Sequence, residues 1–324
     1  MRRVADAALG RRVRRQHLWW RAEVRPGAGV GGGKQGTGVP RRLGPSAEKQ
    51  FAGCTFATAG RRAPVARGEG GEPTLRAEGA TRTPAVRTAV VWDALRSVLT
   101  ERAAATGRDA LDIVDAGGGT GGFAVPLAAL GHTVTVVDPS PDSLAALERR
   151  AKEKGVGVRA LQGDADGLDE LLSRDSADLV LCHSVLEYVE DPTSALAAVA
   201  GVLRKGGAVS VLAANPVASA IHRALAGQFD EARAVLGDPA GTWGDRDPTP
   251  RRFAAEALAE LLSATGFSVS AVHGVRVFAD LVPSRLVDGE PGAAEALVAL
   301  EQAAAAHPVL RDIATQLHVL GHRL

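Results

Sequence analysis

The chain has 324 residues, of which 38 are basic and 37 acidic, so its formal net charge is only +1, and 45% of its residues are hydrophobic. This length fits one large domain or two ordinary ones. Two cysteines are too few for a disulfide framework, and no apolar run is long enough to span a bilayer. We therefore expect a cytoplasmic protein that does not enter the membrane.

Residues 1–80 differ in composition from the rest of the chain. They hold 14 arginines and two lysines against six acidic residues, a net charge of +10, whereas the remaining 244 residues carry a net charge of −9. Few apolar residues in this segment recur with any period, which predicts a disordered basic extension. It could be a tail for an anionic partner or a targeting peptide. We favour a third interpretation, in which this segment is translated sequence upstream of the true start, because Met1 is the only methionine.

The segment 81–324 is predicted to form one domain, because regular patterns begin near residue 85 and continue to the end. Strands and helices alternate along it, which is typical of a parallel sheet covered by helices on both faces. The fold class is therefore α/β and Rossmann-like. In chain order we expect a helix over 86–99, a strand over 111–116, a helix over 123–130, a strand over 133–138, a helix over 141–154, strands over 156–161 and 177–182, a helix over 192–203, a strand over 208–213, an insertion over 216–250, a helix over 250–265, and strands over 267–278 and 316–323.

A glycine-rich turn follows the first predicted strand. Gly117, Gly118 and Gly119 end one apolar run, and a second run ends at Asp138, 21 residues after Gly117. This is the arrangement of a strand, a glycine turn, a helix and a second strand that ends in a carboxylate. Such glycines let a nucleoside approach the backbone, and the carboxylate accepts hydrogen bonds from the ribose hydroxyls. The sequence therefore predicts a cofactor that contains adenosine.

Two interpretations fit these glycines. The spacing of Gly117, Gly119 and Gly122 matches the dinucleotide fingerprint, whereas Gly117, Gly119 and Gly121 preceded by Asp115 match motif I of S-adenosylmethionine-dependent methyltransferases. Asp115 would repel a pyrophosphate but suits the ammonium group of a methionine moiety. We therefore favour S-adenosyl-L-methionine, with an NAD-type or non-catalytic nucleotide-binding module as the alternative.

Further cofactor contacts are expected after the third and fourth predicted strands. Asp164 can accept from the exocyclic amine of adenine while the amide of Ala165 donates to the ring, although an Asx turn would also explain an aspartate there. His183 ends the fourth strand, at the edge of the sheet where ligands bind in open α/β folds.

Residues 82–324 resemble class I methyltransferases and, within that class, the tRNA 5-carboxymethoxyuridine methyltransferase family. The resemblance implies a seven-stranded, mostly parallel sheet with an antiparallel last strand, and methyl transfer to a carboxylate on a tRNA wobble uridine. It also makes His183 a cofactor contact. The matching residues are Arg87 and Trp92, Asp115 to Gly119, Gly131 and His132, His183 to Pro192, Leu203 to Gly207, Asn215, Ala226 to Asp230, Gly274 to Phe278, Asp280 and His318.

The resemblance leaves the methyl acceptor open between tRNA and a small molecule. The domain is acidic, and residues 236–247 are rich in Gly, Asp and Pro, so a small-molecule carboxyl or oxygen methyltransferase is the alternative. If RNA binds, we expect Arg251, Arg252 and Arg276 to contact it.

The catalytic candidates depend on the acceptor. A carboxylate is already ionised and needs no base, whereas an amine or hydroxyl would need one, for which His183 and Tyr188 are the candidates. Arg276 could hold a substrate carboxylate through a bidentate pair, or instead form a salt bridge with Asp280. Arg87, on the first helix, could clamp the cofactor carboxylate. No metal site is expected.

Overall fold

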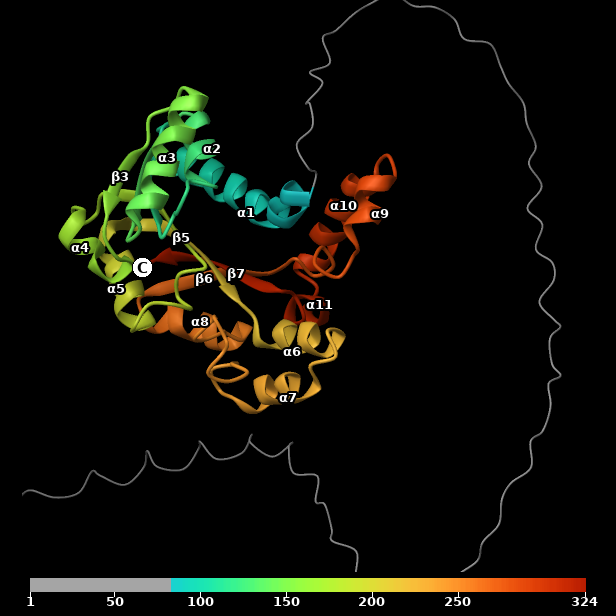
Figure 1. The fold of residues 1–324 in the computed structure, drawn as a ribbon. Coiled ribbons are helices and arrows are strands. Elements are labelled where there is room, and N and C mark those ends of the chain that lie inside the picture. Colours follow the sequence, from blue (N-terminus) through green and yellow to red (C-terminus); the bar gives the residue numbers. More distant parts are fainter. Residues whose placement is uncertain (1–82) are drawn as a thin grey trace, which may run out of the picture. The chain divides into compact units, whose positions relative to one another are not determined.

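The computed structural model describes residues 83–324 (Figure 1), so the predictions for residues 1–80 lie outside the described part of the chain. The described residues build a seven-stranded sheet with the order β3-β2-β1-β4-β5-β7-β6. The strands are β1 Asp112–Ala116, β2 Thr133–Asp138, β3 Arg159–Gln162, β4 Ala177–His183, β5 Leu203–Ala214, β6 Phe267–Val275 and β7 Gln316–Arg323.

The direction of the strands confirms the predicted fold class. Strands β1 to β5 pair in parallel. Strand β7 lies between β5 and β6 and is antiparallel to both, with Ala214 opposite Gln316 and Gln316 opposite Val275. Strand β6 therefore runs in the same direction as β5, and its carboxyl end lies on the same edge of the sheet as the ends of β1, β2 and β4.

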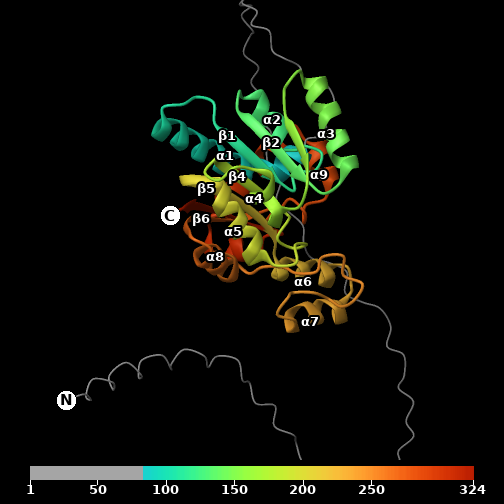
Figure 2. The same ribbon diagram turned by 90° about the vertical axis from the view of Figure 1, so that its left-hand side faces the viewer.

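Helices cover both faces of the sheet (Figure 2). Helices α1 (Thr83–Thr106), α2 (Ala124–Ala129) and α3 (Pro141–Lys154) contribute to one core cluster. Helices α4 (Leu168–Leu171), α5 (Pro192–Val202) and α8 (Ala255–Ala264) contribute to the cluster on the other face. Strand β4 separates the two clusters, and six of its seven residues are buried.

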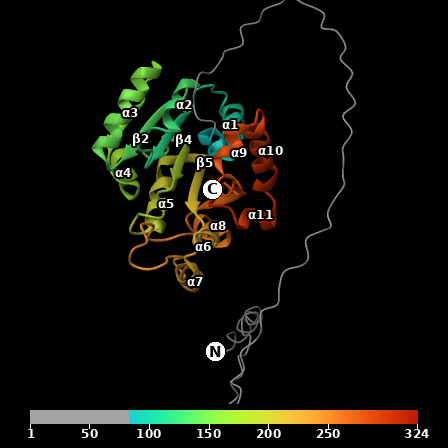
Figure 3. The ribbon, with the colours of Figure 1, turned by 45° about the vertical axis from the view of Figure 1, so that its right-hand side comes forward.

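Two further groups of helices lie outside the alternating strands and helices of the sheet. In the predicted insertion, α6 (Pro216–Leu225) and α7 (Phe229–Gly237) pack together beyond the end of the sheet (Figure 1). The segment 279–315, to which periodicity assigned no element, forms α9 (Ser284–Gly289), α10 (Ala293–Ala305) and α11 (Pro308–Asp312). Helices α9 and α10 lie beside the beginning of α1 (Figure 3), where Val86 packs with Val287 and Leu297.

Caps fix the beginnings of three helices that follow strands. The Ser140 side chain accepts from the Ser143 amide at the start of α3, and Gly155 ends that helix in the left-handed conformation. Asp191 and Asn215 cap α5 and α6 in the same way. In all three helices proline follows the cap, where its missing N–H costs nothing.

Some predicted boundaries were wrong, most clearly that of the helix expected over 250–265. Helix α8 begins only at Ala255. The preceding residues form other contacts instead: the Phe253 amide donates to Ala214 O, and Arg251 donates to the carbonyl of Val189. Tertiary hydrogen bonds there replace the first turn that periodicity predicts.

Asp178 in β4 is the centre of a charge network at the edge of the sheet opposite the glycine turn. Its side chain is fully buried and accepts from the Asp112 amide at 3.0 Å, from Arg204 Nη1 at 2.9 Å and from Arg108. Burial alone would raise the pKa of this carboxyl, but the amide and the two arginines together lower it below its ordinary value.

We expect Asp178→Asn to lower the free energy of unfolding by about 1–3 kcal/mol, because it removes a fully buried carboxylate that accepts from an amide and from partly exposed arginines. Since the folded-state pKa is lowered, the stabilisation is complete above the pKa of the unfolded carboxyl and is lost as pH falls through the folded value. Urea unfolding at pH 7 and at pH 3 measures both effects. Asp175→Asn, which removes an exposed ion pair with Arg323, is the control and should cost less than about 1 kcal/mol.

Candidate functional site

The glycine turn after β1 packs closely against the side chains of Val185 and Asp115. Gly117 has φ +69°, and a Cβ there would lie 2.3 Å from Val185 Cγ2. A Cβ on Gly118 would lie 2.6 Å from the Asp115 carboxylate. Side chains are therefore excluded at both positions, and the turn presents bare backbone to a neighbouring cavity.

Asp138 is held by two backbone amides at the end of β2. Its Oδ2 accepts from the Gly119 amide at 2.8 Å, and its Oδ1 accepts from the Ser140 amide at 2.9 Å. Each carboxylate oxygen can accept a second hydrogen bond. The carboxylate is thus fixed in orientation and still able to bind a ligand.

A cavity of about 440 Å³ opens beside this turn. Four residues predicted to contact the cofactor line it, namely Gly117, Asp138, Asp164 and Ala165. The Asp164 side chain does not cap the short 3-10 helix that follows it, so an Asx turn does not explain this aspartate. The size is within the range of small-molecule sites. The remaining lining residues are Pro139, Asp166, Ser184, Val185, Tyr188, Val189 and Glu190.

Asp115 lies beneath the turn and is only 3% exposed. Burial, and to a lesser degree the charge of Asp138, raise the pKa of the Asp115 carboxyl to about 7. Its proton can therefore be lost or gained near neutral pH, depending on the charge placed beside it.

His183 belongs to a chain of hydrogen bonds that crosses four strands. His183 Nε2 lies 2.8 Å from Ser210 Oγ, which lies 2.8 Å from His318 Nε2. His318 Nδ1 in turn lies 3.1 Å from His273 Nδ1. Burial lowers the pKa of His183 to about 3 and lowers the pKa values of His318 and His273 as well. All three rings are therefore neutral at neutral pH.

The neutral rings leave two proton orders for this chain. The three neutral rings and the Ser210 hydroxyl together carry four polar hydrogens. The three hydrogen bonds of the chain use three of these hydrogens. The hydrogen left over lies either on His183 Nδ1 or at the far end, on His273 Nε2. His183 Nδ1 is buried and has no hydrogen-bond partner among the described residues, and His183 is not among the residues that line the larger cavity.

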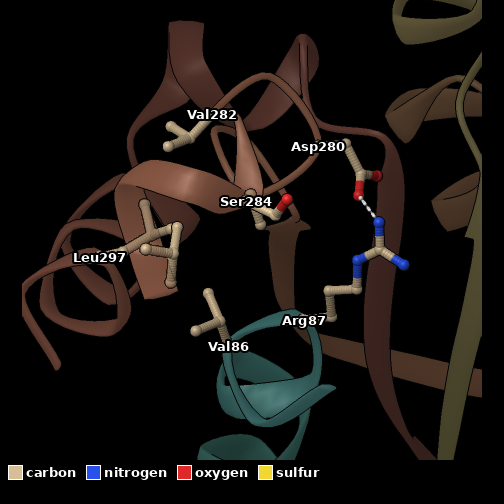
Figure 4. A pocket seen from close by; sticks show the side chains of 8 residues that line it. Val86, Arg87, Asp280, Val282, Ser284 and Leu297 are labelled. Carbon is tan, nitrogen blue, oxygen red and sulfur yellow. Dashed lines mark ion pairs between the residues drawn. The ribbon is translucent and has the colours of Figure 1, made fainter. Parts of the chain in front are cut away.

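Arg87 and Asp280 line a different cavity, of about 150 Å³, between α1 and the segment that leads into α9 (Figure 4), and Arg276 also pairs with Asp280. Arg87 Nη2 lies 2.9 Å from Asp280 Oδ1, and Arg276 Nε lies 3.5 Å from Asp280 Oδ2. The predicted pair of Arg276 with Asp280 is therefore present. Arg87 does not line the larger cavity with the predicted cofactor residues.

Two non-glycine residues at the edge of the sheet have left-handed backbones. They are Ser184 after β4, with φ 56°, and Arg276 after β6, with φ 60°. Such conformations are uncommon and concentrate at functional sites. Ser184 lines the larger cavity and its Oγ accepts from Gln316 Nε2 at 3.0 Å. Sequence reasoning missed Ser184, although its position directly after His183 at a strand end was a usable signal.

One expectation about the RNA contacts was wrong. Arg252 is not free for RNA, because it forms a bidentate pair with Asp247 at 2.7 and 3.0 Å and both side chains are almost fully buried. Glu187 is likewise engaged within the fold: it is 2% exposed and accepts from the Ala214 amide. Arg251 donates to the carbonyls of Val189 and Glu190, beside the larger cavity.

Comparisons with known proteins agree with this site. The family described as a methyltransferase domain matches residues 114–211, which hold the glycine turn, Asp138, Asp164 and His183. The tRNA 5-carboxymethoxyuridine methyltransferase of Escherichia coli K12 is 34% identical over 201 residues, which cover 60% of this chain and 72% of that protein. The chain belongs to the tRNA 5-carboxymethoxyuridine methyltransferase family. It is an S-adenosylmethionine-dependent methyltransferase.

Other methyltransferases are also similar. The ubiquinone biosynthesis O-methyltransferase of Methylocella silvestris is 34% identical over 161 residues, which cover 48% of this chain and 59% of that protein. A solved S-adenosylmethionine-dependent methyltransferase from Mesorhizobium loti has a TM-score of 0.47 and 23% identity, and the match covers 74% of this chain and all of that one.

Between residues 83 and 324, no group of three or more His, Cys, Asp and Glu side chains is placed to hold a metal ion. No helix in this range is long and apolar enough to cross a membrane.

Asp115 should make cofactor binding depend on pH. The ammonium group of S-adenosylhomocysteine favours the ionised carboxylate, so binding below the free pKa of about 7 must release a proton. We expect the Kd to be constant above pH 7 and to rise by up to about tenfold per pH unit below it. Calorimetry from pH 5 to pH 8 measures this.

Two variants test the assignment of that pH dependence. Asp115→Asn should bind S-adenosylhomocysteine more weakly and with no slope between pH 5 and pH 7. Glu148→Gln, which changes an exposed acid on α3, should keep the slope. A constant Kd in the unmodified methyltransferase over the same range would contradict the role of Asp115.

Proposed function

We propose that this methyltransferase transfers a methyl group to the carboxylate of 5-carboxymethoxyuridine at the wobble position of tRNA, in the cytoplasm. Its relative in Escherichia coli is named for that nucleoside. The observation that carries the proposal is the state of Arg276. Its guanidinium is largely buried, yet its only partner among residues 83–324 is Asp280, 3.5 Å from Nε.

The free end of Arg276 suits a carboxylate. With Nε beside Asp280, both Nη groups are without a partner in the described part of the chain, and two parallel N–H donors match the two oxygens of a carboxylate. Asp280 is the one ion-pair partner of both Arg87 and Arg276 among residues 83–324. The N–H donors of Arg276 that Asp280 leaves free are therefore available to an acidic substrate.

Each of the predicted cofactor residues would contact a different part of S-adenosylmethionine. Gly117 and Gly118 would lie against the methionine and ribose, and Asp115 would hold the ammonium group. Asp138 would bind the ribose diol, for which both of its oxygens keep an accepting lone pair. Asp164 and the Ala165 amide would bind the adenine edge, which the unused Asp164 side chain supports.

The methyl transfer needs little chemistry from the chain. S-adenosylmethionine supplies a methyl group that its sulfonium already activates. A carboxylate acceptor is ionised at neutral pH and needs no base, so orientation and exclusion of water are the main contributions. His183 takes part as a neutral ring, since burial lowers its pKa to about 3. Its buried Nδ1 can donate or accept one hydrogen bond at the site.

A small molecule with a hydroxyl group is the second candidate acceptor. Residues 81–324 carry a net charge of −9, Arg252 is engaged by Asp247, and relatives include O-methyltransferases of ubiquinone biosynthesis. Such an acceptor would have to lose a proton. Neutral His183 in its accepting form, or Tyr188 at the rim of the larger cavity, would be the base.

Substitution of Arg276 tests the tRNA proposal. With tRNA from cells that lack this methyltransferase, Arg276→Ala should lower kcat/KM by about 10- to 100-fold, the effect of losing hydrogen bonds to a charged group. The kcat/KM of Arg276→Lys should lie between the values of the unmodified enzyme and of Arg276→Ala, because lysine keeps the charge but not the two parallel N–H donors. The Kd of S-adenosylhomocysteine should stay within about twofold.

The control is Arg285→Ala, which removes an exposed arginine on α9 and should leave transfer unchanged. Mass spectrometry of digested tRNA identifies the product nucleoside. Absence of any methyl ester in tRNA treated with the full chain would exclude the tRNA proposal in favour of a small-molecule acceptor. Unchanged kcat/KM in Arg276→Ala would exclude the role of this arginine.

A further inference from the structure

Glu301 is a fully buried carboxylate whose partners are all backbone amides. It lies on α10, is 0% exposed, and accepts from the amides of three consecutive residues. Its Oε2 accepts from Val277 at 2.9 Å, and its Oε1 accepts from Phe278 at 2.8 Å and from Ala279 at 2.7 Å. Three successive amides that converge on one anion form the kind of concave backbone site that usually binds a phosphate or a carboxylate ligand. Here the chain itself supplies the anion.

The three amides directly follow Arg276. The left-handed backbone of Arg276, with φ 60°, turns the chain out of β6 and into this segment. The peptide between Arg276 and Val277 is held at both of its polar atoms: its carbonyl accepts from the Thr315 amide at 3.2 Å, and its N–H donates to Glu301. A residue with a Cβ disfavours the left-handed conformation, so tertiary contacts must hold it, and Glu301 binds the three amides that follow it.

Glu301 also acts on the charge of the cluster. Its carboxylate favours the charged form of Arg276, which opposes the lowering of the arginine pKa by burial, as Asp280 does. Glu301 itself cannot contact a substrate, because it is fully buried and each of its oxygens is occupied by amides. Any effect on the reaction must therefore pass through the residues that it holds.

We propose that Glu301 is the positioning residue of the acceptor site: it fixes the left-handed turn that points Arg276 toward the carboxylate of the substrate. The inference rests on the proposed role of Arg276. Glu301 does not line the cofactor cavity, and it controls acceptor binding without contacting the acceptor.

The test compares two glutamates of α10 in the full chain. Glu301→Gln keeps the shape of the side chain but places an NH₂ group against one of the amides and removes the charge. We expect the KM for tRNA that carries the unmethylated carboxyl nucleoside to rise about tenfold or more, with kcat and the Kd of S-adenosylhomocysteine each within about twofold. Glu295→Gln, on the exposed first turn of the same helix, should change none of these values.

A double-mutant cycle separates positioning from general destabilisation. If Glu301 acts through Arg276, then Glu301→Gln should raise KM in the unmodified chain but have no further effect in the Arg276→Ala background. Equal effects in both backgrounds, or an unchanged KM in Glu301→Gln alone, would overturn the inference while leaving the proposed function in place. No effect of Arg276→Ala itself would overturn both.

A measurement without substrate completes the test. In Glu301→Gln, hydrogen exchange at the amides of 277–279 should accelerate at least tenfold, while exchange in β1 and β4 stays the same. Unchanged exchange at 277–279 would show that Glu301 does not hold the turn. If Glu301→Gln does not bind S-adenosylhomocysteine, Glu301→Asp, which keeps the charge on a shorter side chain, takes its place in the cycle with the same expected outcomes.

Discussion

The antiparallel pairing of β7 with both β5 and β6 decides where the functional side chains of this methyltransferase lie. Because β7 separates them, β6 runs parallel to β5, and Arg276 leaves β6 at the same edge where β1, β2 and β4 end. Direct pairing of β6 antiparallel to β5 would send Arg276 to the opposite edge, beside the Asp178 network. Asn215 holds the beginning of β7, since its amide group donates to the carbonyls of Asp312 and Ala314 at 2.9 and 2.8 Å.

Two acids near the functional edge are held by backbone amides without an arginine partner. Asp138 and Glu301 accept from amides in this way, whereas Asp280 at the same edge, and Asp178 and Asp247 elsewhere, are paired with arginines. An amide fixes the direction of a carboxylate without bringing a second mobile charge. Such fixed dipoles preorganise a site before any ligand arrives. The bidentate pair of Arg252 with Asp247 is almost fully buried, which explains why Arg252 is unavailable to a substrate.

Local sequence patterns predicted the parts of the fold and site that depend on neighbours in the chain. The bounds of β2, α3 and β7 agree with the structure, because alternation, a serine–proline cap and a terminal glycine act over a few residues. The cluster of Gly117, Asp138, Asp164 and Ala165 followed from the order of strand ends. Contacts between distant residues were missed: Ser210 and His318 are 108 positions apart, and no period links Glu301 to the turn after Arg276. Helices α9 to α11 were missed for the same reason, as they pack against α1, β6 and one another.

The acidic character of the domain and a tRNA acceptor are compatible if recognition is concentrated on one base. A protein that binds an unstacked nucleotide gains affinity from stacking on aromatic rings and from contacts to the base, and needs few phosphate contacts. Tyr188, 60% exposed at the rim of the cofactor cavity, and Phe229, 71% exposed on the insertion, offer such rings. The carboxylate of a modified uridine then pairs with the N–H donors of Arg276 that Asp280 leaves free. In this arrangement specificity comes from the modification itself, so a broad basic surface on residues 83–324 is not required.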